Sequence, residues 1–276
     1  MAATELSFEF FPPKTADGLD KLRATRAQLA TLKPKFVSVT FGAGGTTQQG
    51  TLDLVVEMKN DGLEAAPHLS CIGATRESIR QILQHYRDHD IRHIVALRGD
   101  MPSGMGEMGE LRYASDLIEF IRAETGDWFH IEAAAYPEYH PQARSPKHDL
   151  VAFANKIKAG ANSAITQYFF NADAYFRFVD DARKLGVEVP ITPGIMPITN
   201  YSQLMRFSDM CGAEVPRWIA KRLESYGDDR ESIRAFGTDV VTDLCRRLLD
   251  SGVPGLHFYT LNTAAASRAI CERLAI

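Results

Sequence analysis

The chain has 276 residues, 45% of them hydrophobic, and a formal net charge of -4 at pH 7 with a pI near 6.1. This length allows one large barrel or two ordinary domains, and the charge, with no run of Lys or Arg, argues against nucleic-acid and membrane-surface partners. No apolar stretch approaches the roughly 18 residues of a membrane span, and no leader precedes the first strand-like run, so we expect a cytoplasmic protein that binds small molecules.

Eight short apolar or β-branched runs alternate with amphipathic stretches along the chain. Each stretch carries apolar residues at helical spacing, as Ile79, Ile82, Leu83 and Tyr86 do. The predicted strands cover residues 6–11, 36–40, 65–69, 93–97, 129–135, 163–167, 191–195 and 256–260.

Strict alternation implies parallel strands joined by right-handed crossovers, in either an open doubly wound sheet or a closed barrel. Eight units favour a (β/α)8 TIM barrel. An open dinucleotide-binding sheet should have a Gly-rich turn after its first strand, but residues 11–14 read Phe-Pro-Pro-Lys. The interval between the seventh and eighth strands is about twice the others, and we interpret it as an elaborated connection within a single domain of residues 1–276.

Reactive groups of such barrels gather at the C-terminal ends of the strands. In this chain those positions are polar, and they would converge on one rim. They are Glu9, Thr40 with Phe41, His68, Arg98 with Asp100, Tyr136 with Glu138 and His140, Gln167, and Tyr259 with Asn262.

Glu9 alternates with Phe8 and Phe10 and shares its strand face with Ser7 and Phe11, which should point inward. A carboxyl group desolvated by aromatic neighbours has a raised pKa, as a proton donor near neutral pH requires. Glu9 is therefore a general-acid candidate. The alternative is a Glu paired with Lys or Arg to close the barrel.

Two further segments suggest ligand binding. Arg98 and Asp100 flank Gly99 at a strand end, where they could hold a phosphate or tune a redox ring, or form a local ion pair. The glycine-rich residues 41–47 could cradle phosphate oxygens or only reverse the chain.

No metal site is expected. The histidines considered, His68, His93, His140 and His257, lack the spacing of a helical ligand motif. The four cysteines, Cys71, Cys211, Cys245 and Cys271, form no CxxC pair and indicate reduced thiols.

Taken together, nine segments make the chain resemble the methylenetetrahydrofolate reductase family, in its bacterial, catalytic-domain form. They occur in the family's order over essentially the whole chain. The segments are SFEFFPP at 7–13, KFVSVT at 35–40, AAPHL at 65–69, ALRGD at 96–100, AAYPE at 134–138, AGAN at 159–162, ITQYFF at 165–170, PGIMP at 193–197 and HFYTLN at 257–262.

The resemblance implies noncovalent FAD on the barrel rim, with NADH or NADPH and a folate using one site in turn. Hydride would pass through flavin N5 to 5,10-methylenetetrahydrofolate and give 5-methyltetrahydrofolate, in one-carbon metabolism and methionine supply. The sequence fixes neither the direction of flux nor the choice of nicotinamide donor. We also expect a homo-oligomer.

By the same resemblance, Glu9 would protonate folate N10, Asp100 would lie between pterin and flavin, and Gln167 would bind the pterin. Gln203 and Phe207 map to a substrate lid, although packing is the ordinary role of an aromatic residue in an amphipathic helix. The positions that would face FAD or nicotinamide are Thr40, Phe41, Ala43, His68, Arg98, Gly99, Asp100, Tyr113, Ala114, Tyr136, His140, Asp149 and Lys156.

Three positions depart from the family pattern. Thr263 stands where relatives often carry a basic residue, which puts one contact to the folate tail in doubt. Ala152 and Asn155 replace polar or basic residues that help hold the FAD diphosphate in some relatives, whereas Lys156 remains. We therefore expect FAD binding that is altered in detail.

Two other classes of function remain as alternatives. A barrel aldolase or lyase would use a Schiff-base lysine, but no predicted strand ends in lysine. A noncatalytic folate- or flavin-binding protein would need the pocket but no proton donor at Glu9.

Overall fold

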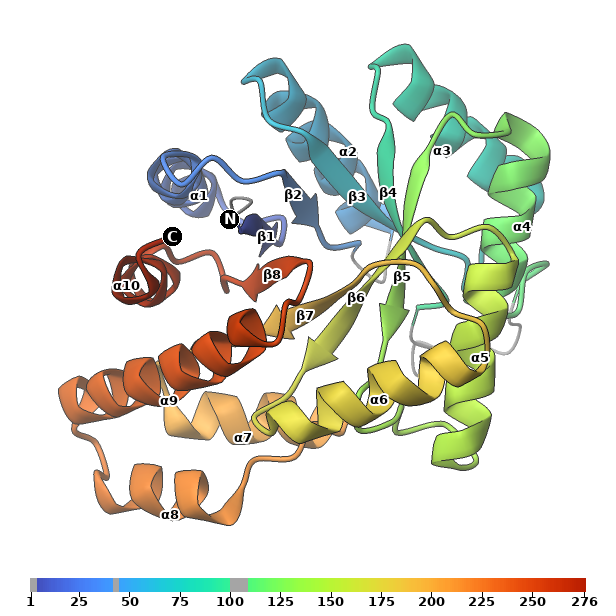
Figure 1. Cartoon of the computed structure of the whole chain (residues 1–276). Helices are drawn as coiled ribbons and strands as arrows, with labels where there is room; N and C mark the ends of the chain where they lie inside the picture. The colour runs from blue at the N-terminus through green and yellow to red at the C-terminus, as the bar shows by residue number, and fades with distance from the viewer. Residues whose placement is uncertain (1–3, 42–44, 100–108) are drawn as a thin grey trace.

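The computed structural model describes residues 4–41, 45–99 and 109–276, except for the side chains of 45–48. Within these residues, eight parallel strands pair in chain order and close into a barrel, because β1 also pairs with β8. Helices surround the strands (Figure 1). The predicted (β/α)8 barrel is confirmed.

The predicted strands are confirmed to within one residue at each end. The strands are β1 (Glu5–Phe10), β2 (Phe36–Val39), β3 (Ala65–Ser70), β4 (His93–Leu97), β5 (His130–Ala135), β6 (Ser163–Tyr168), β7 (Ile191–Ile195) and β8 (Gly255–Tyr259). The helices are α1 (Ala16–Ala30), α2 (Gly45–Asn60), α3 (Arg76–Asp88), α4 (Ala114–Thr125), α5 (Pro146–Lys158), α6 (Ala172–Lys184), α7 (Tyr201–Cys211), α8 (Arg217–Ser225), α9 (Arg230–Asp250) and α10 (Ala265–Leu274).

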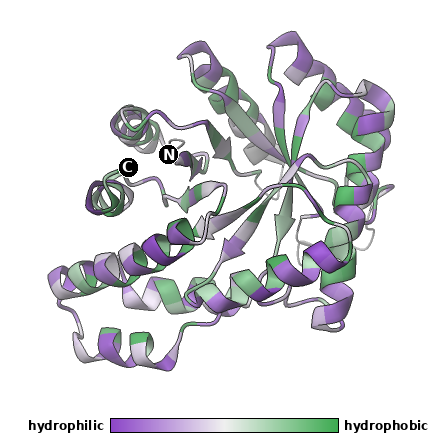
Figure 2. Cartoon of the chain, in the orientation of Figure 1, coloured by the Kyte–Doolittle hydropathy of each residue, from purple (hydrophilic) through white to green (hydrophobic). Residues whose placement is uncertain are grey.

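The main hydrophobic core lies between the strands and the helices. Phe8 and Phe10 of β1 are fully buried, and the Phe8 ring stacks on Phe258 of β8 with centroids 5.8 Å apart. The helices have hydrophobic and hydrophilic residues on different faces (Figure 2), so the apolar faces can cover the barrel. No described helix combines the length and the apolar character that crossing a membrane would demand.

The inward-facing residues form a separate and smaller apolar cluster. Phe36, Ala66, Val95 and Ile165 pack together there, with Leu97 against them. Their strand neighbours belong to the outer core, as alternation along a strand requires. Other inward positions are polar and buried, including Ser7, His68 and His257. The barrel interior therefore combines an apolar cluster with polar side chains.

The connection between β7 and β8 contains α7, α8 and α9, so the expected elaboration is confirmed. Phe236 of α9 packs between the rings of Trp218 and Tyr226, with centroid distances of 6.1 and 6.0 Å. Gly237 allows α9 to approach the segment after β7: a Cβ atom there would lie 2.4 Å from the Ile198 carbonyl oxygen. This close contact fixes the connection against the barrel.

Replacement of each of two helical glycines by alanine should change the free energy of unfolding in opposite directions. Gly237→Ala should lower the free energy of unfolding by about 1–3 kcal/mol, because its methyl group would collide with Ile198. Gly50→Ala in α2 should raise it by up to about 1 kcal/mol, because the nearest atom is an ordinary 3.7 Å away and alanine is the better helix former. Urea unfolding of both variants would measure this, and stabilisation by Gly237→Ala would contradict the packing interpretation.

Candidate active site

Glu9 lies near the C-terminal end of β1, with its side chain 19% exposed. The alternation Ser-Phe-Glu-Phe turns Phe8 and Phe10 into the outer core, and it therefore turns Ser7 and Glu9 into the barrel. The inward orientation predicted from the sequence is confirmed for these two residues, whereas Phe11 lies beyond the strand and is 43% exposed.

Two buried imidazoles face the Glu9 carboxyl group. His68 Nε2 lies 3.3 Å and His257 Nε2 lies 3.9 Å from Glu9 Oε2, and neither nitrogen has a hydrogen-bond partner among the described residues. His257 Nδ1 is 2.8 Å from the Ser7 hydroxyl oxygen, which fixes that ring. The carboxyl group is therefore beside histidines and not in the Lys or Arg pair that the sequence left open.

Burial lowers the pKa of His68 below its ordinary 6.5; Glu9 opposes this shift and His257 adds to it. The His68 imidazole is therefore neutral at neutral pH, and its Nε2 can either donate a hydrogen bond or accept one.

The end of β8 fixes the position of Glu9. The Thr260 hydroxyl donates to the Glu9 carbonyl oxygen over 2.6 Å. The Asn262 side chain accepts from the Phe11 amide and donates to the Phe11 carbonyl oxygen, at 3.1 and 2.9 Å. These contacts tie the two ends of the chain together next to the carboxyl group.

Tyr259 extends the polar rim toward β6. Its hydroxyl donates to the Thr166 carbonyl oxygen over 2.7 Å, and burial raises the pKa of this phenol well above 10. Gly194 allows the approach, because a Cβ there would lie 2.7 Å from the Tyr259 ring. Gln167, the predicted pterin ligand, is the next residue along β6, and its side-chain oxygen accepts from the Tyr168 amide at 2.9 Å.

A second set of predicted residues is connected through Gln142, which no sequence pattern identified. The Arg98 guanidinium donates to the Gln142 side-chain oxygen, and the Gln142 amide donates to His140 Nδ1 over 3.0 Å. The His140 amide in turn donates to the Asp149 carboxylate over 2.9 Å. The side chain of Tyr136 meets the His140 ring edge-on at 4.6 Å. The structure thus brings four predicted cofactor positions together.

The end of β4 requires glycine at position 99. Gly99 has φ +85°, and a Cβ there would lie 2.0 Å from the Ser70 hydroxyl oxygen. That hydroxyl donates to the Arg98 carbonyl oxygen over 2.8 Å. Cys71 Sγ lies 3.6 Å from the carbonyl oxygens of both Arg98 and Tyr113, so the start of α4 adjoins this strand end.

Lys156 projects from α5 toward β5, where its ammonium group donates to the Ala134 carbonyl oxygen. Burial lowers the pKa of Lys156 to about 8, and the charge of Asp149 opposes the shift. An enclosed cation of this kind suits an anionic ligand.

The remaining predicted positions are less closely connected. Thr40 and Phe41 follow β2 and are partly buried, Ala114 begins α4, and Tyr113 is 62% exposed. Gln203 and Phe207 lie on α7, which Tyr168 holds through a 3.0 Å contact between its hydroxyl and that of Ser208. Ala43 and Asp100 lie outside the described residues.

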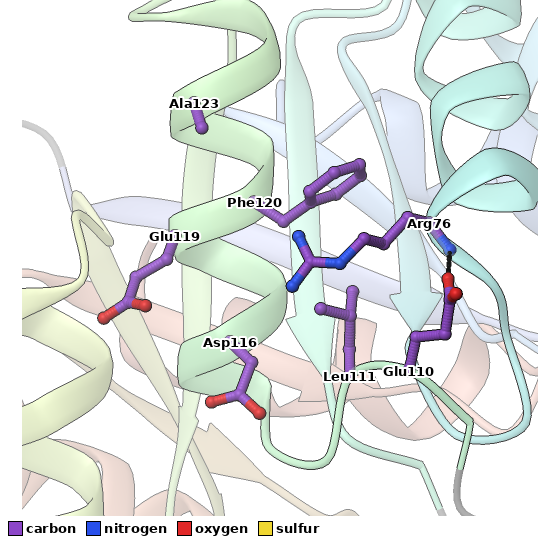
Figure 3. Close-up of a pocket in the computed structure, with 7 residues that line it drawn as sticks. All are labelled: Arg76, Glu110, Leu111, Asp116, Glu119, Phe120 and Ala123. Carbon is purple, nitrogen blue, oxygen red and sulfur yellow. Dashed lines mark hydrogen bonds between the residues drawn. The ribbon is translucent and has the colours of Figure 1, made fainter.

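Two cavities on the outside of the barrel do not include these residues. One of about 300 Å³ lies between α3 and α4, where the Arg76 guanidinium lies over Phe120 at 5.2 Å (Figure 3). The other, of about 270 Å³, lies beside α6 and the loop before β8. Neither contains a residue that the sequence analysis assigned to chemistry.

The four cysteines are free, and among the described residues one group, His93, His130 and Glu132, could hold a metal ion. Of these three residues, only His93 was weighed as a ligand from the sequence, because strand pairing alone brings His130 and Glu132 beside it.

Comparison with known proteins gives a consistent result. The family model described as methylenetetrahydrofolate reductase matches residues 1–275. The 5,10-methylenetetrahydrofolate reductases of Pectobacterium carotovorum subsp. carotovorum and Escherichia coli (strain K12) are 45% and 44% identical to the chain, over 98% of the chain and 90% of each relative.

Among solved structures, an uncharacterized protein from Clostridium thermocellum that binds two copies of 5-methyl-5,6,7,8-tetrahydrofolic acid aligns with a TM-score of 0.68. The alignment covers 99% of this chain and 96% of that one, at 16% identity. At this identity the likeness shows the shared fold alone.

The Asn262 contacts predict a measurable effect on stability. Asn262→Ala removes both hydrogen bonds to Phe11 and should lower the free energy of unfolding by about 1–2 kcal/mol. Gln28→Ala, at an exposed position of α1, is the control and should change it by less than about 0.5 kcal/mol. Equal urea midpoints for the two variants would show that the contacts with Phe11 do not contribute to the free energy of unfolding.

Proposed function

Since the chain belongs to the methylenetetrahydrofolate reductase family, we propose that it reduces 5,10-methylenetetrahydrofolate to 5-methyltetrahydrofolate at the barrel rim. The donor would be NADH or NADPH, and the two substrates would use one site in turn around FAD. The observation that carries the proposal is the position of Glu9, inside the barrel and beside two imidazole nitrogens that have no described partner.

The rim residues fit a flavin nucleotide. Lys156 offers a half-buried cation, and the chain of contacts from Arg98 through Gln142 to His140 fixes further donors of the site. The unpartnered His68 Nε2 offers a polar contact within the barrel. When bound, FAD supplies the chemistry of accepting hydride from a nicotinamide and releasing it to a folate.

Glu9 is the proton donor in this proposal. Opening the bridge of the folate substrate requires a proton at N10, and a carboxyl group within the barrel can deliver it. The backbone of Glu9 is held by the Thr260 hydroxyl, so the side chain approaches a substrate from a fixed position. The neutral His68 ring beside it brings no positive charge to the carboxyl group.

Folate binding would involve β6, β7 and α7. Gln167 lies beside the contact of Tyr259 with Thr166, and its amide can recognise the hydrogen-bonding edge of a pterin. Phe207 on α7 can stack on a flat ring. The folate ligand of the Clostridium thermocellum protein agrees with a folate in a barrel of this shape.

A lyase with a Schiff-base lysine is less well supported. Lys156 has the lowered pKa that such chemistry needs, but it lies on α5 and donates to a strand carbonyl oxygen. No described strand ends in lysine.

Glu9→Gln tests the proton donor. Reduction of bound flavin by NADH or NADPH should continue, while reoxidation by methylenetetrahydrofolate should slow by about 10²–10⁴-fold, because glutamine cannot donate the proton. Rapid-mixing measurements of flavin absorbance would follow both half-reactions. Glu5→Gln, on the same strand but exposed and paired with Lys35 at 2.7 Å, should leave both rates unchanged. Equal slowing of both half-reactions by Glu9→Gln would reject its role as acid.

Lys156→Ala tests the cofactor site. FAD should dissociate at least about tenfold more readily than from the unaltered protein, measured by flavin fluorescence after dilution. Lys158→Ala, exposed on the same helix, is the matched control and should retain FAD.

The charge of Lys156 also predicts a pH dependence. Because its pKa without ligand is about 8, the ammonium group is present below that pH, and its contribution to FAD affinity should fall as pH rises through 8. This decline should be absent in Lys156→Ala. If the variant and the unaltered protein retain FAD equally well at every pH, Lys156 has only a packing role.

A further inference from the structure

A second polar cluster lies at the N-terminal ends of the strands, away from Glu9. His93 begins β4, His130 begins β5, and Glu132 follows two residues later on β5. The register pairs His93 directly with His130. Because side chains alternate along a strand, His130 and Glu132 share one face, and all three side chains meet.

The ligand atoms have the spacing of a metal site. His93 Nε2 and His130 Nε2 lie 3.2 and 3.4 Å from Glu132 Oε1, and the three atoms lie within 4.8 Å of one another. Zinc bonds of about 2.0–2.1 Å in tetrahedral geometry place neighbouring ligand atoms about 3.3 Å apart. The distances from Glu132 Oε1 to the two nitrogens already match this spacing.

The carboxylate of Glu132 is buried, with the residue 5% exposed, and its Oε2 atom has no hydrogen-bond partner among the described residues. A buried carboxylate oxygen without a partner is costly, and a cation would satisfy it. The carboxylate therefore offers an ion an oxygen atom that the described residues leave unused.

The surroundings provide access and a further ligand. The side chain of His130 is 45% exposed, so an ion can enter from solvent, whereas that of His93 is 9% exposed. The Ser163 hydroxyl oxygen at the start of β6 lies 2.6 Å from His130 Nε2. The Phe36 ring packs on His93 with centroids 4.3 Å apart and limits its movement.

We propose that His93, His130 and Glu132 bind one divalent transition-metal ion of the zinc type, with the Ser163 hydroxyl or water completing the coordination. Two imidazoles and one carboxylate are a donor set that zinc prefers. The ion would join β4 to β5 at the end of the barrel opposite Glu9, so its role is structural. Both imidazoles bind in their neutral form, with the remaining proton on Nδ1.

Zinc binding to the purified full-length protein tests this proposal. After treatment with EDTA and its removal, titration with ZnCl₂ in a calorimeter should give one ion per chain, and saturating zinc should raise the Tm by about 5 °C. Co²⁺ as a substitute should give the visible absorption of a tetrahedral site. His130→Asn and Glu132→Gln should each weaken binding by at least about tenfold.

A matched control removes another pair of histidines. His85 lies in the last turn of α3 and His89 caps the C-terminal end of that helix, with ring centroids 4.4 Å apart. They are an alternative place for a metal ion on the surface. The double variant His85→Asn and His89→Asn should retain zinc binding and the shift in Tm. Loss of binding in this variant, with binding intact in His130→Asn, would overturn the proposal.

Two other results would also overturn it. No zinc uptake by the unaltered protein would identify the cluster as a hydrogen-bonded group only. Equal uptake by the unaltered protein, His130→Asn and Glu132→Gln would place the ion elsewhere. If Glu132→Gln does not fold, His130→Asn decides the question, because its exposed side chain can be replaced without disturbing the core.

Discussion

The closure of the barrel by β1 and β8 is the constraint on which the candidate site depends. Pairing of Glu9 with Tyr259 joins residues that are 250 positions apart, and it places His257 next to the Glu9 carboxyl group. The contacts of Thr260 with Glu9 and of Asn262 with Phe11 then fix this junction. Without closure, Glu9 would lie on an edge strand in water, away from His257.

The two carboxyl groups of the barrel interior, Glu9 and Glu132, lie in different surroundings. Glu132 receives contacts from two imidazoles and a hydroxyl group, and the sum outweighs the cost of burial, so it stays ionised. Glu9 is more exposed and faces His68, whose pKa burial lowers. One end of the barrel therefore holds an ionised carboxylate, and the other holds a carboxyl group beside the neutral His68 ring.

The sequence predicts most of the fold, because alternation of apolar runs and helical faces is a local property. Ser7 and Glu9 could be oriented from the two phenylalanines that flank Glu9. Contacts that depend on register could not be predicted: His130 and Glu132 meet His93 only through strand pairing, and Gln142 reaches Arg98 across a loop. The spacing rule for helical metal motifs does not apply to ligands on neighbouring strands, so it could not predict the cluster of His93, His130 and Glu132.

The three positions predicted to depart from the family pattern, Thr263, Ala152 and Asn155, carry no charged side chain. The Thr263 hydroxyl donates to the Thr260 carbonyl oxygen at 3.0 Å, so this side chain completes the turn after β8 instead of offering a cation. Asn155 is exposed and Ala152 has no polar group, which leaves Lys156 as the cation of α5 enclosed near β5. An enclosed ammonium group interacts with an anion more strongly than an exposed one, because water screens it less. Among Ala152, Asn155 and Lys156, only Lys156 therefore offers α5 a charge that could meet an anion near β5.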